Sequence, residues 1–298
     1  FVFTCPNCDV ALTYHRFDES LRCHYCGANY KMPKTCPSCG REYIKYTGIG
    51  TQQVEEQLKL VFPNVRCLRM DMDTTSGKTA HRDILDAFTR READVLIGTQ
   101  MVAKGLDIPN VTLVGVVFAD STLFHSDFRS SERTFQLLTQ VAGRAGRADK
   151  EGRVVIQTNA PGHRAIRLCT KHDYKTFYNL EIGDRLRTLF PPFAVFVRAQ
   201  FACADENAAA DAAERFANGV TKTILTALKP ANAENELVFA LAGAAPIRRR
   251  EGLFRYAVII KLVRTANTAA AINAIYAFSD GCADECYRGI EVNPQDML

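Results

Sequence analysis

Six cysteines in the first 39 residues are spaced to bind a metal ion. They form three C-x-x-C pairs, Cys5/Cys8, Cys23/Cys26 and Cys36/Cys39. In each pair a proline or polar residue lies inside and a glycine or aspartate follows, which is typical of a tight turn that points two thiolates at one cation. Two such pairs about 12 to 20 residues apart make a tetrahedral four-cysteine zinc site. The first two pairs, with 14 residues between them, predict such a site.

The third pair, Cys36/Cys39, has no partner pair in the chain and supplies only half of a second site. A fourth C-x-x-C upstream of Phe1 would complete it, so we expect that the chain begins inside a two-zinc module. The alternative is a disulfide framework, which needs an oxidising compartment, and no secretion signal follows Phe1. His15 and His24 are alternative ligands, although four thiolates already close a site.

Two arginines near the middle of the chain are spaced to bind an anion. The segment Q-V-A-G-R-A-G-R contains Gln140, Arg144 and Arg147, and it follows an apolar helical stripe. Residues three apart on a helix share one face, so Arg144 and Arg147 are expected to converge on one phosphate. Arginine suits this role because it is always charged and binds phosphate oxygens through two parallel hydrogen bonds. The alternative is a solvated basic helix end with two glycines that allow close packing.

Two further segments are expected to present backbone N–H groups to phosphate. One is I-G-T-Q-M-V-A-K-G-L-D-I-P, residues 97–109, in which a strand ends in Gly-Thr and enters a helix. The other is G-I-G-T, residues 48–51, which precedes a helix over 52–62. A third stretch, T-S-G-K-T at residues 75–79, looks like the end of a P-loop. Met72 stands where a P-loop needs glycine, so we interpret this stretch as a helix start, with a P-loop kinase or GTPase as the alternative.

The elements that position these residues alternate between strand and helix. Apolar runs predict strands over 65–71, 95–99, 113–119 and 154–158, and stripes such as Phe135, Leu138 and Val141 predict amphipathic helices between them. Continuous apolar strands are buried on both faces, as in a parallel sheet. A doubly wound α/β domain is therefore predicted from about residue 44 to 189.

A second α/β domain is predicted after Pro191 and Pro192, which stop regular structure. The expected order is strand, helix, strand, strand, helix, strand, as in ferredoxin-like split sandwiches. Its elements are expected at residues 194–204, 206–229, 237–242, 254–263, 268–279 and 289–292. The predicted domains are thus a Cys-rich zinc module (1–43), an α/β domain (44–189) and a C-terminal α/β domain (190–298).

The composition excludes several classes of protein but does not indicate a function. The 298 residues are 47% hydrophobic and 23% charged, which excludes a disordered or fibrous chain. No apolar run reaches the length of a transmembrane helix. The net charge of +4 is too small to predict nucleic-acid binding by itself. A basic run, Arg248–Arg250 with Arg255 and Tyr256, is either a contact for single-stranded nucleic acid or simply a hairpin tip.

Taken together, the motifs resemble those of one helicase family. Q-x-x-G-R-x-G-R and I-G-T-Q-M-V-A-K-G resemble the sixth and fifth motifs of superfamily-two helicases. With the three C-x-x-C pairs, G-I-G-T-Q, R-M-D-M-D-T-T and P-P-F, the chain resembles the C-terminal half of the PriA (primosomal protein N′) family of replication-restart helicases. The resemblance implies a RecA-like second helicase lobe with a parallel sheet, a zinc module inserted in it and an S10-like C-terminal domain.

The resemblance also implies roles for particular residues. Cys5, Cys8, Cys23 and Cys26 would hold one zinc ion, and Cys36 and Cys39 would be half of a second site. Arg144 and Arg147, with Gln140, would complete a catalytic site for ATP. Gly105 and Asp107 would approach the nucleotide. The residues implied to contact nucleic acid are Gly50, Thr51, Thr99, Gln100 and Lys104.

For the intact protein the resemblance implies an ATP-dependent 3′-to-5′ DNA helicase that reloads the primosome at stalled forks. ATP and Mg²⁺ would bind to a P-loop in a first lobe that this chain lacks, so we expect the chain alone to be inactive. Implied partners are forked and single-stranded DNA, single-strand-binding protein, and primosome or helicase-loading proteins in the bacterial cytoplasm at the nucleoid, without a membrane. The alternative is a non-enzymatic zinc-ribbon adaptor for DNA or protein.

Overall fold

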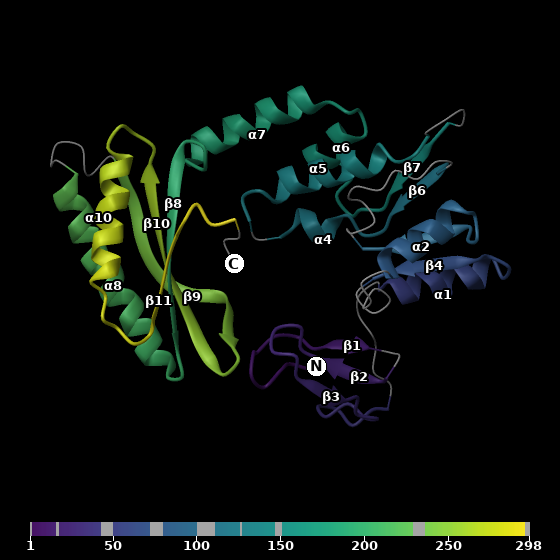
Figure 1. The fold of residues 1–298 in the computed structure, drawn as a ribbon, viewed down its shortest axis with the longest axis horizontal. Coiled ribbons are helices and arrows are strands. Elements are labelled where there is room, and N and C mark those ends of the chain that lie inside the picture. The colour runs from purple at the N-terminus through teal and green to yellow at the C-terminus, as the bar shows by residue number, and fades with distance from the viewer. Residues whose placement is uncertain are drawn as a thin grey trace. The chain divides into compact units, whose positions relative to one another are not determined.

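The computed structural model describes most of the chain. The described residues are 2–15, 18–42, 50–71, 80–99, 111–125, 127–146, 151–228 and 236–295. They fall into two compact units: Phe1–Tyr46 joins Ile182–Leu298 in one, and Thr47–Glu181 forms the other (Figure 1). The zinc module and the C-terminal domain therefore belong to the same unit, although residues 47–181 lie between them in sequence.

The zinc module is a small antiparallel sheet carried on tight turns. Its strands are β1 (Thr13–His15), β2 (Ser20–Arg22) and β3 (Asn29–Lys31), in that order. In all three C-x-x-C turns the residue after the second cysteine has a positive φ: 56° at Asp9, 72° at Gly27 and 70° at Gly40. The left-handed backbone that the sequence pattern required is thus present three times.

The second unit contains two pairs of parallel strands with helices between them. The first part consists of α1 (Thr51–Val61), β4 (Cys67–Met70), α2 (Ala80–Thr89) and β5 (Val95–Gly98), with β4 parallel to β5. The second part consists of β6 (Leu113–Val116), α4 (Asp120–Leu123), α5 (Ser130–Ala142) and β7 (Arg153–Ile156), with β6 parallel to β7. The alternation and the parallel pairing predicted from the apolar runs are confirmed.

Helices α6 (Arg164–Cys169) and α7 (Tyr174–Thr188) follow β7. Phe135 of α5 stacks on Phe177 of α7 with ring centroids 4.2 Å apart, and both side chains are buried. This contact anchors α5, the helix that contains Gln140, in the core of the second unit. Helix α7 ends at Thr188, shortly before the two prolines that were expected to end it.

The C-terminal domain has the predicted order of elements. They are β8 (Ala194–Cys203), α8 (Glu206–Ala227), β9 (Leu237–Arg250), β10 (Leu253–Val263), α10 (Thr268–Asp280) and β11 (Tyr287–Val292). The sheet order β11-β8-β10-β9 is antiparallel throughout, and α8 and α10 cover one face (Figure 1). This is the split βαβ arrangement.

Strand β9 differs from its predicted length. The prediction ended it at Ala242, but the strand continues to Arg250 through Gly243 and Pro246. Proline is tolerated there because β9 is the outermost strand of the sheet and the pairing with β10 shifts between Phe254 and Tyr256. The extension carries the β9–β10 hairpin well beyond the core. Within the described residues, no helix is long and apolar enough to cross a membrane.

Candidate metal centre and phosphate-facing helix ends

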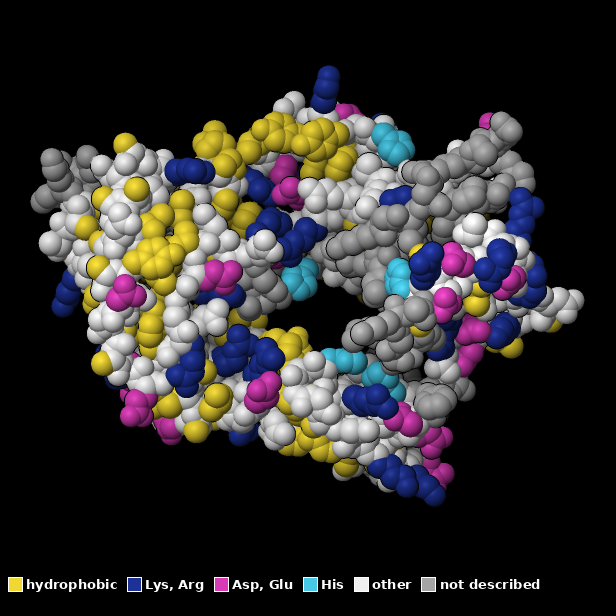
Figure 2. Space-filling model, viewed as in Figure 1, with side chains coloured by type: hydrophobic (Ala, Val, Ile, Leu, Met, Phe, Trp, Pro, Cys, Tyr) yellow, Lys and Arg dark blue, Asp and Glu magenta, His cyan; other side chains and the backbone are white. Residues whose placement is uncertain are grey.

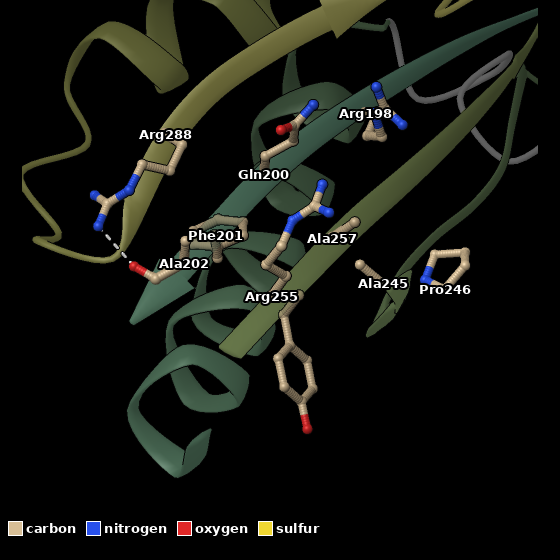
Figure 3. A pocket seen from close by; sticks show the side chains of 10 residues that line it. Arg198, Gln200, Phe201, Ala202, Ala245, Pro246, Arg255, Ala257 and Arg288 are labelled. Carbon is tan, nitrogen blue, oxygen red and sulfur yellow. Dashed lines mark hydrogen bonds between the residues drawn. The ribbon is translucent and has the colours of Figure 1, made fainter. Parts of the chain in front are cut away.

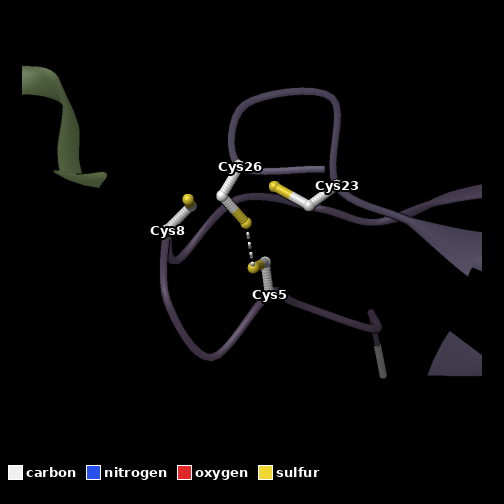
Figure 4. A group of neighbouring side chains, drawn as sticks. All are labelled: Cys5, Cys8, Cys23 and Cys26. Carbon is white, nitrogen blue, oxygen red and sulfur yellow. Dashed lines mark hydrogen bonds between the residues drawn. The ribbon is translucent and has the colours of Figure 1, made fainter. Parts of the chain in front are cut away.

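Four cysteines converge in the zinc module. The sulfur atoms of Cys5, Cys8, Cys23 and Cys26 all lie within 4.8 Å of one another (Figure 4). Cys5 Sγ and Cys26 Sγ are 3.7 Å apart, close to the edge of ~3.8 Å that a tetrahedron with zinc–sulfur bonds of about 2.3 Å requires. None of the four is in a disulfide. The donor set and its spacing therefore fit a zinc ion and exclude the disulfide framework for these four cysteines.

Burial and local hydrogen bonds shift the pKa values of the cluster's thiols in opposite directions. Cys5 and Cys8 are fully buried, and burial raises the pKa of Cys8 to about 12. Burial acts in the same direction on Cys23, but the backbone N–H groups of Cys26 and Tyr25 outweigh it and lower the pKa of that thiol to about 7. Such a cluster releases protons when a divalent cation binds, because the ligands must be thiolates.

The third C-x-x-C turn has the same backbone but not the same surroundings. Gly40 N–H donates to Cys36 O at 2.8 Å, matching Gly27 N–H to Cys23 O at 2.9 Å. Cys39 is nevertheless exposed, and among the described residues the four-sulfur group is the only candidate metal cluster. That this pair is half of a second site stays a prediction.

The loop before α5 is organised by a buried carboxylate. The side chain of Asp127 has no exposed surface and accepts from the backbone N–H of Arg129 at 2.8 Å. It also forms ion pairs with the guanidinium groups of Arg129 and Arg133. Burial acts to raise the pKa of Asp127, but the N–H and guanidinium of Arg129 outweigh it, so the pKa is lowered. Asp127 therefore orders the loop through its contacts with Arg129 and Arg133.

Helix α5 presents a polar face to a hollow in the second unit. Arg133, Gln136 and Gln140 line it together with His125. Arg133 and Gln136 were not predicted from the sequence, although their spacing from Gln140, seven and four residues, places all three on one helical face. That periodicity was the signal that could have found them.

Helical spacing does not explain how Arg144 is placed. Helix α5 ends at Ala142, and Gly146, with φ of 75°, donates its N–H to Val111 O at 3.1 Å. The argument that Arg144 and Arg147 share one helical face is therefore wrong at Arg144, which lies beyond the helix in the turn that follows. Arg147 lies outside the described residues, as do Gln100, Lys104, Gly105 and Asp107.

Three of the residues expected to contact nucleic acid lie at one edge of the β4–β5 pair. Thr99 is exposed directly after β5, and Gly98 pairs with Met70 at the end of β4. Asp71, the next residue, accepts a hydrogen bond of 2.5 Å from the Thr51 hydroxyl at the start of α1. Gly50 precedes that helix without a capping side chain. Carboxyl ends of parallel strands and a helix N-terminus thus meet at this edge.

The arginine run of the C-terminal domain is largely occupied by internal partners. Arg248 pairs with Glu206, and Arg250 pairs with Glu251 at 3.2 Å. A separate hollow on the face of the sheet opposite α8 and α10 is lined by Arg198, Gln200, Arg255 and Arg288 (Figure 3).

The charge in this hollow is only partly compensated. Arg198 pairs with Glu291 at 2.9 Å, and Arg288 donates to Ala202 O at 2.7 Å. Burial lowers the pKa of Arg255, and the positive charges of Arg250 and Arg198 add to this effect. On the face drawn in Figure 2, Lys and Arg side chains gather beside β9. This domain therefore carries local positive charge that the overall net charge conceals.

Two parts of the chain match family models. Residues 5–31 match the model of the PriA DNA helicase Cys-rich region domain, and residues 43–149 match the helicase conserved C-terminal domain. The chain is similar to the "Replication restart protein PriA" of Bacillus subtilis, with 46% identity over 92% of this chain and 33% of that protein. For the protein of the same name from Synechocystis, identity is 49% over 66% of this chain and 24% of that protein.

The similarity extends to Haemophilus influenzae, whose replication restart protein PriA is 45% identical over 65% of this chain and 26% of its own length. The chain thus spans a quarter to a third of the length of these curated relatives. The match to the Cys-rich region covers all four cysteines of the converged cluster. We therefore describe that cluster as a zinc site.

Proposed function

Because the chain belongs to the PriA family of replication restart proteins, we propose that it forms the second lobe, zinc module and C-terminal domain of an ATP-dependent 3′-to-5′ DNA helicase. The observation that carries this proposal is the 46% identity that runs through both the Cys-rich region and the helicase domain. In the intact protein the activity would reload the primosome at stalled forks. The P-loop, ATP and Mg²⁺ would belong to a first lobe outside this chain.

In this proposal the end of α5 contributes to ATP hydrolysis. Arg144 and Arg147 stabilise negative charge that develops on the transferring phosphoryl group, as arginine fingers do. Gln140 lies one turn before Arg144 and takes part from the same polar face as Arg133. Gly105 and Asp107 approach the nucleotide. Asp127 is a positioning residue here, because it acts on the start of α5 through Arg129 and Arg133.

The edge of the β4–β5 pair would contact the DNA backbone. The Thr51 hydroxyl is already bonded to Asp71, so we assign the contact to the backbone N–H groups of the first turn of α1, after Gly50. Thr99, which is exposed after β5, would add a hydroxyl, followed along the chain by Gln100 and Lys104. Contacts of this kind position DNA without reading its sequence.

The zinc module would bind forked DNA or partner proteins. One zinc ion is expected in this chain and two in the intact protein, where the Cys36/Cys39 pair would find its complement. Partners in this proposal are forked and single-stranded DNA, single-strand-binding protein, and primosome and helicase-loading proteins, in the bacterial cytoplasm at the nucleoid.

The test is DNA-stimulated ATP hydrolysis, measured in this chain and in the longer protein that contains it. We expect essentially no turnover by the chain alone. In the longer protein, Arg144→Ala should lower kcat by about a thousandfold or more, the usual contribution of an arginine finger. Arg82→Ala is the matched control, because Arg82 is an exposed arginine of α2 that forms a surface ion pair with Asp86.

Two results would reject the proposal. Turnover by the isolated chain that survives Arg144→Ala would place the hydrolytic site elsewhere in this chain. Full activity of the longer protein carrying Arg144→Ala would favour the alternative, a zinc-ribbon adaptor whose α/β unit only supports contacts with DNA or protein.

A further inference from the structure

The tip of the β9–β10 hairpin contacts the zinc site directly. The backbone N–H of Glu251 donates to Cys8 Sγ at 3.4 Å, although the two residues are 243 positions apart. The neighbouring N–H, that of Gly252, donates to Asn7 O at 2.9 Å. Both acceptors belong to the turn that carries the zinc ligands Cys5 and Cys8. Figure 4 shows a green strand end on the side of the cluster where Cys8 lies.

The hairpin is built to offer these two donors. Arg250 and Leu253 pair across the turn, and the two residues between them have left-handed φ values, 54° at Glu251 and 85° at Gly252. This is a type I′ turn, in which the N–H groups of the two central residues are not used by the hairpin itself. They point away from the strands and are available to an acceptor outside the sheet.

A side chain strengthens the contact. Arg249 Nη1 donates to Pro6 O at 3.2 Å, so a third hydrogen bond reaches the same ligand turn. The Arg249 guanidinium lies 5.0 Å from the ring centre of Phe254, its partner across the hairpin. This stacking holds the arginine in place while it bonds to the module.

Cys8 differs in this respect from its neighbours in the cluster. The N–H groups that bond to Cys5 come from Asn7 and Cys8, and those that bond to Cys23 come from Tyr25 and Cys26. Each of those sets lies within its own C-x-x-C turn. The donor to Cys8 comes instead from the C-terminal domain. One ligand of the metal is therefore oriented from outside the module.

We propose that the β9–β10 hairpin is part of the metal centre, so that it retains the zinc ion and the zinc ion in turn holds the C-terminal domain against the module. Hydrogen bonds to a ligand orient it and stabilise its ionised form, and their loss typically lowers metal affinity 10–100-fold. Such coupling is reciprocal, because a contact that favours the bound metal is itself favoured by the metal. The inference rests on the zinc site alone and is independent of helicase activity.

The first test measures the rate of zinc release to a chelator by the zinc-loaded chain. Gly252→Val should release zinc about 10–100-fold faster, because a β-branched residue at a φ of 85° displaces the turn. Arg249→Ala should have a smaller effect in the same direction. Glu251→Asn keeps the N–H and suits the turn, so it should release zinc at the original rate, as should Arg215→Ala, which removes a distant ion pair to Asp284.

The second test needs no variant and covers the case in which Gly252→Val fails to fold. With an NMR-active cadmium isotope in place of zinc, the amide proton of Glu251 should show scalar coupling to the metal through Cys8 Sγ. After metal removal the amides of Glu251 and Gly252 should exchange faster with solvent, while that of Ile260, buried in β10, stays protected. Unchanged zinc release in Gly252→Val and Arg249→Ala, or equal exchange of the two turn amides with and without metal, would overturn the proposal.

Discussion

The zinc module and the loop before α5 differ in what holds their side chains in place. In the module, the apolar cluster consists of three buried cysteines, with a few partly buried residues such as Val10 and Leu12 around them, and Leu21 of β2 is also buried. The loop before α5 has no such dependence, because Asp127 holds Arg129 and Arg133 while Phe135 stacks on Phe177. One region depends on an ion for its core, and the other on buried side chains.

This difference predicts which of the two regions needs the metal ion to stay folded. A module whose strands have three residues each buries too little apolar surface to offset the entropy of ordering its backbone. Its stability must therefore come mostly from metal binding, with the remainder from the β9–β10 hairpin. The second unit has its own apolar core, which includes Phe135, Leu138 and Phe177, and should remain folded without zinc.

The largest expected effect is the loss of zinc in Cys5→Ser. Structural zinc contributes about 10–16 kcal/mol of apparent binding free energy in small zinc domains, and that energy is folding energy for the module. Removing a ligand that is fully buried should reduce zinc content from one ion per chain to nearly none. Metal analysis gives the content, and hydrogen exchange should show that the module unfolds while α5 stays protected.

Cys36→Ser is the matched control, because Cys36 lies in a turn with the same hydrogen bond but outside the four-sulfur cluster. The zinc content of this variant should remain at one ion per chain. Two tightly held ions in the unmodified chain would contradict the interpretation of the third pair as half of a site. Loss of protection in α5 on zinc removal would contradict the independence of the two regions.

Local patterns predicted most of the fold. Short apolar runs located β4, β5, β6 and β7 to within two or three residues. The expected burial of these strands on both faces is wrong for β6 and β7, because Leu113 and Val155 are exposed. The four zinc ligands were also predicted from a local pattern. Ligand spacing and the residue after each pair are properties of a single turn, so they can be recognised without knowledge of the rest of the chain.

What sequence reasoning missed depends on distant or competing interactions. The hydrogen bond from Glu251 to Cys8 joins residues that no local pattern relates. The end of α5 was placed too late because the helix ends at Ala142, before Arg144, whereas the spacing argument assumed that it continued. Strand β9 was placed too short because an edge position permits Pro246, which only the sheet order reveals.

The next largest effect is expected for Asp127→Asn in the second unit. The substitution removes charge-assisted bonds to Arg129 and Arg133, and the remaining amide oxygen accepts more weakly. Because the Arg133 side chain is 40% exposed, solvent screening reduces the effect, and we expect a loss of about 1–3 kcal/mol in the free energy of unfolding. Denaturant unfolding of the second unit measures it. Zinc content should not change.

The pH dependence of that loss identifies the carboxylate as its cause. The pKa of Asp127 is lowered in the folded state, so its contribution is present above the unfolded value, about 4, and disappears as the pH falls through the lower folded value. The difference in unfolding free energy between the original chain and the Asp127→Asn variant should therefore shrink at low pH. A difference that persists there would come from packing and not from charge. The control Asp86→Asn, which removes an exposed pair with Arg82, should change stability by less than about 1 kcal/mol.

The smallest effect is expected for Thr51→Val, which separates the stability of the β4–β5 edge from the role in DNA binding that we propose for it. The variant removes the hydroxyl that donates to Asp71, while Arg69 Nε still lies 3.4 Å from the same carboxylate. We expect a loss of about 1 kcal/mol in the free energy of unfolding, against a change within about 0.5 kcal/mol for the exposed control Thr89→Val. DNA affinity of the longer protein should be unchanged, because the backbone N–H groups after Gly50 remain. Weaker DNA binding by Thr51→Val, at equal stability of the unit, would instead make the hydroxyl the phosphate donor.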